Sequence, residues 1–238
     1  MTESLRILAL IPARGGSKRL PGKNKRLLGG KPLICWSIQA AQGIPEICDI
    51  LISTDDPETA EISKAAGVLV PWLRPKELAS DTATSVDVAL HALDWYEKEH
   101  GEIDGLLLLQ PTSPFRTVQS IEKALQIFEN DPSCPVVSIS PTHAHPLWAM
   151  KLEGDYCVPF FGEHGLNKRS QDLEPAYTVN GSIYLYTKDY LRNTKSDLAI
   201  NYRPLVIESQ SEVLDIDDIN DFDMAEKMLS ISLSDNLK

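Results

Sequence analysis

The chain has 238 residues and a formal net charge of −11, from 34 acidic and 23 basic residues. Its length suits one large domain with a substantial core, and a hydrophobic content of 42% is ordinary for a globular protein. The acidic balance argues against a nucleic-acid-binding surface, which would normally be basic.

Apolar runs and helical periodicities alternate along the first 140 residues. The apolar runs predict strands at Leu5–Ile11, Asp49–Ser53, Val68–Val70, Leu106–Leu109 and Val136–Ser140. The periodic segments predict helices at Pro32–Gln42, Pro57–Ala66, Ser85–His100 and Val118–Glu129. Strands that alternate with helices of about ten residues or more imply βαβ units, so we expect an α/β protein with a mainly parallel sheet.

The pattern changes after Pro141. Residues at about 142–180 include His, Pro, Gly and short strand-like pieces but no long amphipathic helix, which indicates an arm on the main sheet. Regular structure resumes with expected strands and a closing helix at Ser182–Tyr186, Leu205–Ile207, Val213–Ile216 and Asn220–Ser230. We therefore expect residues 1–238 to form a single domain that carries this inserted arm.

The stretch IPARGGSKRLPGKNKR, residues 11–26, follows the first expected strand. Ligands of parallel α/β proteins bind at the carboxyl ends of strands. Glycine lets backbone N–H groups approach a phosphate, and Arg or Lys supplies countercharge. The stretch therefore predicts an anion site, with a solvated basic loop as the alternative. A P-loop fits poorly, because five residues separate Gly16 from Gly22 and Asn24 replaces the hydroxyl residue.

Six segments, taken together and in order, resemble the acylneuraminate cytidylyltransferase (CMP-sialic acid synthetase) family. They are ALIPARGGSKRLPGKN at 9–24, STDD at 53–56, LRPKELASDTATS at 73–85, LLLQPTSPFRT at 107–117, VNGSIY at 179–184 and LDIDDINDFDMAE at 214–226. The resemblance implies a three-layer, Rossmann-like fold of the nucleotide-diphospho-sugar-transferase type, with helices on both sheet faces and a small dimerisation arm. It also implies transfer of CMP from CTP to the C2 hydroxyl of a nonulosonic acid (sialic, legionaminic or similar), with release of pyrophosphate, for surface glycan synthesis.

The resemblance implies a nucleotide site built from three of these segments. Arg14 and Lys23 would hold the triphosphate of CTP and offset charge that develops during transfer, which makes both catalytic. Asn24 would hold the loop or the ligand. Arg74 and Ser85 would contact the cytidine nucleotide.

Several residues beside these motifs have competing interpretations. Ser80, Asp81 or Thr82 would cap the helix that follows at least as readily as they would contact the nucleotide. Arg116 would either pair with an anion or support the next helix. Two further basic residues of the first loop, Arg19 and Arg26, are expected to be mostly solvated.

The LDIDD segment is the metal candidate. Asp215 and Asp217 stand at i and i+2, so in an extended segment both carboxylates point to one side. Two such groups suit Mg²⁺, with Mn²⁺ as a possible substitute, and the resemblance assigns them the metal and gives Asp217 a catalytic part. The alternative is an acidic helix N-terminus, a role that we assign to Asp218, Asp221 and Asp223.

The resemblance places the sugar acid near Gln110, Lys168, Arg169 and Asn180. Gln110 ends a buried strand, and its amide suits a sugar hydroxyl or carboxylate. Lys168 and Arg169 carry the charge that a carboxylate attracts, although a solvated basic turn is the alternative. An Asn-Gly turn is the alternative for Asn180. The arm is expected to pack against a second copy in a homodimer and to line the sugar pocket.

Two other functions stay open from the sequence. One is a CMP-KDO synthetase or another sugar nucleotidyltransferase, although Asn24 and LASDTATS weigh against KDO. The other is a non-catalytic nucleotide-binding module, against which the retained basic and acidic candidates weigh. The sequence does not decide which nonulosonic acid is used. Thr178 and Val179 stand where sialic acid enzymes often have Arg-Pro or Arg-Ile, and this difference favours a diacetylated analogue over N-acetylneuraminic acid.

The sequence predicts a cytoplasmic location without a membrane partner. Its beginning lacks a signal-peptide pattern, and no stretch approaches the ~20 apolar residues of a membrane span. The four cysteines are widely spaced without a C-x-x-C pair, which favours free, mostly buried thiols in a reducing compartment.

Overall fold

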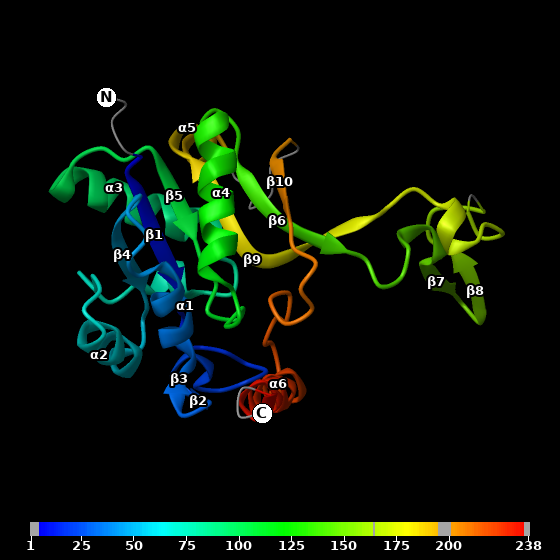
Figure 1. Ribbon diagram of the computed structural model, residues 1–238, viewed down its shortest axis with the longest axis horizontal. Coiled ribbons are helices and arrows are strands. Elements are labelled where there is room, and N and C mark those ends of the chain that lie inside the picture. Colours follow the sequence, from blue (N-terminus) through cyan, green and yellow to red (C-terminus); the bar gives the residue numbers. More distant parts are fainter. Residues whose placement is uncertain (1–4, 164, 195–200, 236–238) are drawn as a thin grey trace.

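Six strands form the central sheet of the computed structural model, which describes residues 5–163, 165–194 and 201–235 (Figure 1). The strands are β1 (Ile7–Pro12), β4 (Ile47–Ser53), β5 (Gly105–Leu108), β6 (Val136–Pro141), β9 (Tyr177–Thr187) and β10 (Arg203–Val206). Their order is β10-β6-β9-β5-β1-β4, and β9 runs antiparallel to both of its neighbours while the other pairs are parallel. The predicted mainly parallel α/β sheet is therefore confirmed, with one reversed central strand.

The apolar run of β1 supplies both faces of the sheet, as buried parallel strands do. Ile7, Ala9 and Ile11 belong to one apolar cluster, and Leu8 and Leu10 belong to a second cluster on the opposite face. Helices α1 (Leu33–Ala41), α2 (Pro57–Ala65) and α4 (Val118–Asn130) pack on the first cluster, and α3 (Ser85–His100) and α5 (Lys188–Asn193) pack on the second. These contacts give the three layers predicted from the resemblance.

A third apolar cluster joins the two ends of the chain. Phe222 and Ala225 of α6 (Ile219–Asp235) pack with Leu20 and Leu28, and Ile216 is buried in the same cluster. The partners come from the first loop, which includes η1 (Lys23–Lys25) and the short strands β2 (Leu27–Leu28) and β3 (Lys31–Pro32). This packing holds the LDIDD segment beside the basic loop.

The arm projects from the α/β body between β6 and β9 (Figure 1). Its core is an antiparallel hairpin of β7 (Met150–Glu153) and β8 (Tyr156–Pro159), flanked by the short helices η3 (Pro146–Trp148) and η4 (Ser170–Asp172). The short strands predicted in this segment are therefore present.

Three of the expected elements differ from the structure. In Val68–Val70, Leu69 forms one isolated bridge with Leu51, so the predicted strand is wrong. Val213–Ile216 is irregular because its apolar side chains go to different clusters and its N–H groups bond to nearby turns and to Thr112. The strand predicted at Ser182–Tyr186 is the end of the longer β9. Helix α5 was not predicted, since six residues are too few to show a periodicity.

Two expectations from composition can also be compared with the structure. All four cysteines are free thiols, but three are only partly buried and Cys157 is exposed, so the prediction of mostly buried thiols is wrong. Within the described part of the chain, we find no helix that is both long and apolar enough to cross a membrane.

Candidate active site

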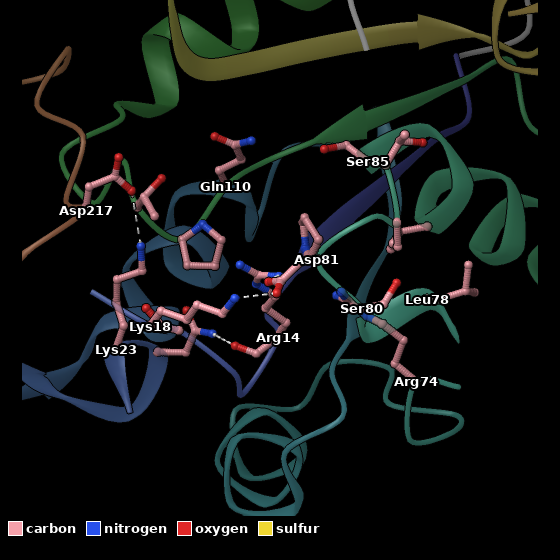
Figure 2. A pocket seen from close by; sticks show the side chains of 18 of the residues that line it. Arg14, Lys18, Lys23, Arg74, Leu78, Ser80, Asp81, Ser85, Gln110 and Asp217 are labelled. Atoms are coloured by element: carbon pink, nitrogen blue, oxygen red, sulfur yellow. Dashed lines mark hydrogen bonds and ion pairs between the residues drawn. The ribbon is translucent and has the colours of Figure 1, made fainter. Parts of the chain in front are cut away.

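A cavity of about 570 Å³ opens at the carboxyl ends of β1 and β5 (Figure 2). Its walls come from the first loop, from the segment that leads into α3, from the residues after β5 and from the LDIDD segment. Five basic side chains line it: Arg14, Lys18, Arg19, Lys23 and Arg74. Its position fits the rule that parallel α/β proteins bind ligands at this sheet edge, and its charge suits a polyanion.

Two cations of the first loop converge on one carboxylate. Nη1 of Arg14 lies 3.0 Å from Oδ1 of Asp81, and Nζ of Lys18 lies 2.5 Å from Oδ2 (Figure 2). The hydrogen bonds from Lys18 and then Arg14 lower the pKa of Asp81. Asp81 is therefore the present partner of Arg14 and Lys18, two cations that would otherwise be available to a phosphate group. The cap of α3 is Thr84, which forms a capping box with Asp87, so the prediction of a cap at Ser80, Asp81 or Thr82 is wrong.

The loop that carries Arg14 is fixed by short internal bonds. Nδ2 of the buried Asn24 donates a hydrogen bond of 3.0 Å to the carbonyl oxygen of Arg14. The N–H of Gly15 donates to Oδ1 of Asp55 at 2.8 Å. Gly22 has a φ of +67° immediately before η1, a turn that favours glycine. Of the two roles predicted for Asn24, the structure shows the one that holds the loop, although Asn24 also lines the cavity.

Lys23 and Asp217 lie together on another wall (Figure 2), and Asp215 lines the same cavity. Nζ of Lys23 donates to the carbonyl of Ile216 at 2.8 Å and lies 3.6 Å from Oδ1 of Asp217. Burial lowers the pKa of Lys23, and the charges of Asp217 and Asp215 oppose this effect. Burial raises the pKa of Asp215, against a hydrogen bond from Thr112. The sequence motif thus places both carboxylates beside Lys23 in the cavity.

Arg19 and Arg26 are exposed, as expected, and each also has a partner that was not predicted. Nη2 of Arg19 lies 2.7 Å from Oδ2 of Asp217, although the side chain of Arg19 is 68% exposed. The guanidinium of Arg26 lies over the ring of Phe222, 5.1 Å from its centroid. Asp218 and Asp221 accept backbone N–H bonds at the start of α6, as predicted for helix-capping residues.

Asp215 and Asp217 have the ligand chemistry that suits a magnesium ion. Carboxylate oxygens are hard ligands, and Mg²⁺ usually takes one or two carboxylates together with waters and substrate phosphates. Across the described residues, no group of three or more His, Cys, Asp or Glu side chains could hold a metal ion. An incomplete set of two carboxylates is what a shared protein–nucleotide site needs.

Arg74 and Ser85 line the same cavity from the side of α3 (Figure 2). The guanidinium of Arg74 is buried and donates from Nε to Oγ of Ser53 at 2.9 Å and from Nη2 to the carbonyl of Ser53. Burial lowers the pKa of Arg74 to about 10, so the side chain stays charged at neutral pH. Arg74 thus braces the end of β4 as well as facing the cavity.

A second cavity of about 610 Å³ adjoins the first and shares Gln110 and Asp215 with it. Its other walls come from β6, β9 and the segment after β10. In contrast to the first cavity, its lining of described residues includes no Lys or Arg. A reaction between two bound molecules would therefore take place near the two shared side chains.

A bulge in β9 places Asn180 and Gly181 in the lining of this second cavity. Val137 pairs with Tyr184, and Ile139 pairs with Val179. Residues 180–183 of β9 therefore lie opposite a single residue of β6, Ser138. Oδ1 of Asn180 accepts from Oγ of Ser138 at 2.6 Å, while its buried Nδ2 has no hydrogen-bond partner among the described residues. Asn180 therefore lines the second cavity and carries an amide donor without a partner among the described residues.

A family model described as Cytidylyltransferase matches residues 8–146. The chain belongs to the cytidylyltransferase family. The resemblance found in the sequence motifs is confirmed at this level.

Relatives of this cytidylyltransferase act on acidic sugars, according to their names. A CMP-N,N'-diacetyllegionaminic acid synthase of Legionella pneumophila is 39% identical over 236 residues, which cover 96% of this chain and 98% of the relative. A Campylobacter jejuni pseudaminic acid cytidylyltransferase is 30% identical, covering 94% and 97%. An N-acylneuraminate cytidylyltransferase of Streptococcus agalactiae is 36% identical over 90% of this chain, which spans only 51% of that longer relative.

A solved structure shows the same fold as this cytidylyltransferase. It is a CMP:2-keto-3-deoxy-manno-octonic acid synthetase complexed with CTP, with a TM-score of 0.72, 20% sequence identity, and coverage of 95% of this chain and 99% of that chain. At this identity the likeness supports the fold alone, and it confirms the predicted three-layer α/β class.

Two of the predicted acceptor residues of the cytidylyltransferase lie away from both cavities. Lys168 and Arg169 are exposed in the arm, between β8 and β9, and neither lines a cavity. Within one chain the structure therefore does not bring them to Gln110 and Asn180. Their predicted contact with the sugar acid stays a prediction.

Three residues of the site were missed or left open. Asp81 pairs with two loop cations, and Thr112 bonds to Asp215; both lie inside quoted motifs, so motif position was the available signal. Arg116 fits neither interpretation offered for it. It is buried and donates to backbone and hydroxyl oxygens of Ser182, Gln110 and Ser37.

Proposed function

We propose that this cytidylyltransferase transfers CMP from CTP to the C2 hydroxyl of a nonulosonic acid and releases pyrophosphate. The observation that carries the proposal is the pair of adjoining cavities, one lined by five cations and one without, which share Gln110 and Asp215. The 39% identity to a CMP-N,N'-diacetyllegionaminic acid synthase over nearly the whole of both chains supports this substrate class.

The cationic cavity would bind CTP. Arg14, Lys18 and Lys23 would exchange their present oxygen partners for phosphate oxygens and stabilise the charge on the departing pyrophosphate. Lys23 suits this role because its side chain is only 12% exposed, and a charge acts more strongly where water is excluded. Arg74 and Ser85 would contact the nucleoside part, on the side of the cavity formed by α3.

Asp215 and Asp217 would hold Mg²⁺, for which Mn²⁺ could substitute. The ion, when bound, supplies charge neutralisation at the phosphate groups. Asp217 would leave its contact with Arg19, which is exposed and can rotate to a phosphate oxygen. Asp215 borders both cavities, so its carboxylate would lie near the point where nucleotide and acceptor meet.

The second cavity would bind the acceptor sugar. Gln110 and the free Nδ2 of Asn180 would hydrogen-bond its oxygen atoms and direct the C2 hydroxyl toward the α-phosphorus of CTP. Direct displacement depends on alignment and electrostatic stabilisation, so it needs no covalent intermediate on a Ser or Cys side chain.

We also propose a homodimer formed through the arm. Exposed apolar side chains gather on and beside the hairpin, and such a patch marks a protein-contact surface. They are Met150, Leu152, Tyr156, Phe160 and Phe161. In the dimer, Lys168 and Arg169 of one chain would lie at the acceptor cavity of the other. Sedimentation of the intact protein at micromolar concentration would contradict this arrangement if only monomers were present.

The substrate class is tested by a panel assay that reads pyrophosphate release. Purified protein with Mg²⁺ is incubated with CTP and, separately, N-acetylneuraminic, N,N'-diacetyllegionaminic, pseudaminic and 2-keto-3-deoxy-manno-octonic acids. We expect turnover with at least one of the first three acids, strongest with N,N'-diacetyllegionaminic acid. Preference for the fourth acid would identify a CMP-KDO synthetase, and CTP binding without any turnover would identify a non-catalytic module. Because CTP is a cytoplasmic metabolite, we place the enzyme in the cytoplasm.

A further inference from the structure

Arg116 is a fully charged side chain in the interior beside the acceptor cavity. It is only 4% exposed, and none of the ion pairs among the described residues includes it. Burial lowers its pKa to about 9, partly offset by the charge of Glu212, so it stays protonated at neutral pH. A buried charge held without a contacting carboxylate is costly, and it needs an explanation.

The three hydrogen bonds of Arg116 join the two walls of the acceptor cavity. Nη2 donates to the carbonyl oxygen of Gln110 at 2.9 Å, and Nε donates to the carbonyl oxygen of Ser182 at 2.6 Å. Nη1 donates to Oγ of Ser37 on α1 at 3.1 Å. Gln110 lies two residues beyond Leu108, the last paired residue of β5, and Ser182 lies in the bulge of β9, so both carbonyls fall outside the paired register of the sheet. The guanidinium replaces the missing ladder bonds at this point.

The guanidinium of Arg116 contacts a wall of a cavity that has no Lys or Arg in its described lining. That lining includes two acidic residues, Glu208 and Asp215. An acceptor acid would bring a further negative charge into this space. The buried guanidinium contacts the backbone of Gln110 and of the bulge, in surroundings whose low polarity strengthens its field.

We propose that Arg116 is a positioning residue for the acceptor acid: its guanidinium fixes Gln110 against the β9 bulge and supplies positive charge behind the acceptor cavity. The inference rests on the proposed function and deepens it. Arg116 acts through Gln110 and Asn180 and contributes no group that touches the substrate. Loss of Arg116 should therefore weaken acceptor use while leaving CTP binding intact.

The test compares Arg116→Gln and Arg116→Lys with Arg203→Gln, a control that removes an exposed arginine paired with Asp131. Charged hydrogen bonds are each worth roughly tenfold to a hundredfold, so we expect the acceptor kcat/KM of Arg116→Gln to fall at least about tenfold. Arg116→Lys keeps the charge and should recover part of this loss. The KM for CTP should stay within about twofold in all three variants, since the hydrogen-bond partners of Arg116 include none of the five cations that line the first cavity.

A second readout separates charge from packing. Inhibition of turnover by N,N'-diacetyllegionaminic acid methyl ester is compared with the KM of the free acid. Arg116→Gln should reduce the preference for the charged form at least about fivefold, and Arg116→Lys should preserve it. A purely structural role for Arg116 predicts that the apparent affinities for the free acid, the ester and CTP all fall equally, in proportion to the loss of folded protein. That result would overturn the inference.

Two further outcomes are covered by the same assay. If the Arg116 variants do not fold, Ser37→Ala removes one anchor and should raise the acceptor KM about threefold without changing the KM for CTP; an unchanged acceptor KM would contradict the inference. If the wild-type protein turns over no acceptor, the proposed function fails first, and this failure is distinct from that of Arg116.

Discussion

Replacing Gly181 with alanine would disturb the acceptor cavity through a single contact. Gly181 lies in the β9 bulge with a φ of +76°, and a Cβ atom there would lie 3.1 Å from Oε1 of Gln110. That separation is tighter than ordinary van der Waals contact, so the Gln110 amide would shift by a few tenths of an ångström. The shift would move one of the two side chains that border both cavities.

The size of the effect follows from two separate costs. A non-glycine residue in the left-handed region costs about 1–2 kcal/mol, which lowers the Tm of a chain of this length by roughly 2–8 °C. Misplacing a substrate-positioning group by about 1 Å can cost ~100-fold in rate, so a smaller shift of Gln110 should reduce acceptor kcat/KM about tenfold.

Gly67→Ala is the matched control for this prediction. Gly67 has a φ of +79°, and a Cβ atom there meets nothing within 4 Å, so it carries the backbone cost without the contact. Both variants are followed by thermal unfolding and by pyrophosphate release at saturating CTP with varied acceptor. We expect similar Tm losses but a raised acceptor KM only in Gly181→Ala. Identical acceptor constants in the two variants would refute the role given to Gln110.

Three further predictions concern the nucleotide cavity. Asp217→Asn removes one metal ligand and should lower kcat about 10²–10³-fold, whereas unchanged Mg²⁺-dependent turnover would exclude Asp217 from the metal site. Lys23→Met keeps the side-chain volume but not the charge, so kcat/KM for CTP should fall about 10²-fold, and a change in acceptor KM alone would contradict its role. Because hydrogen bonds from Lys18 and Arg14 lower the pKa of Asp81, its native carboxylate stabilises the fold above the ordinary carboxyl pKa. The Tm difference between wild type and Asp81→Asn should therefore disappear as pH falls through that lowered value, and a difference that persists in acid would contradict the pairing.

Elements with local signals were predictable from the sequence. Ser85–His100 forms the helix that its apolar period and Gly101 predicted, although its Thr84–Asp87 capping box was not identified from the sequence. The run of β1 was recognisable because it is buried on both faces. The reversed direction of β9 was not predictable, since strand periodicity carries no information about polarity within a sheet.

The candidate site was predictable where its residues belong to recognisable motifs. The order of the motifs predicted that Lys23 and Asp217 belong to one site, and the structure places them on one wall of the cavity. The pairing of Arg14 with Asp81 and the burial of Arg116 depend on how distant segments pack. A sequence pattern cannot show which side chains become buried at such a junction, so these contacts required the structure.

All of these predictions depend on one proposed activity, in which the chain joins CMP to a nonulosonic acid through one phosphodiester bond. Phosphorus-31 NMR of a reaction with CTP, Mg²⁺ and N,N'-diacetyllegionaminic acid follows both products of that activity. We expect equal amounts of pyrophosphate and of a product with a single phosphodiester resonance, whose formation requires the acceptor. A product that retains two linked phosphates, or CTP that stays intact with this and the other nonulosonic acids, would contradict it.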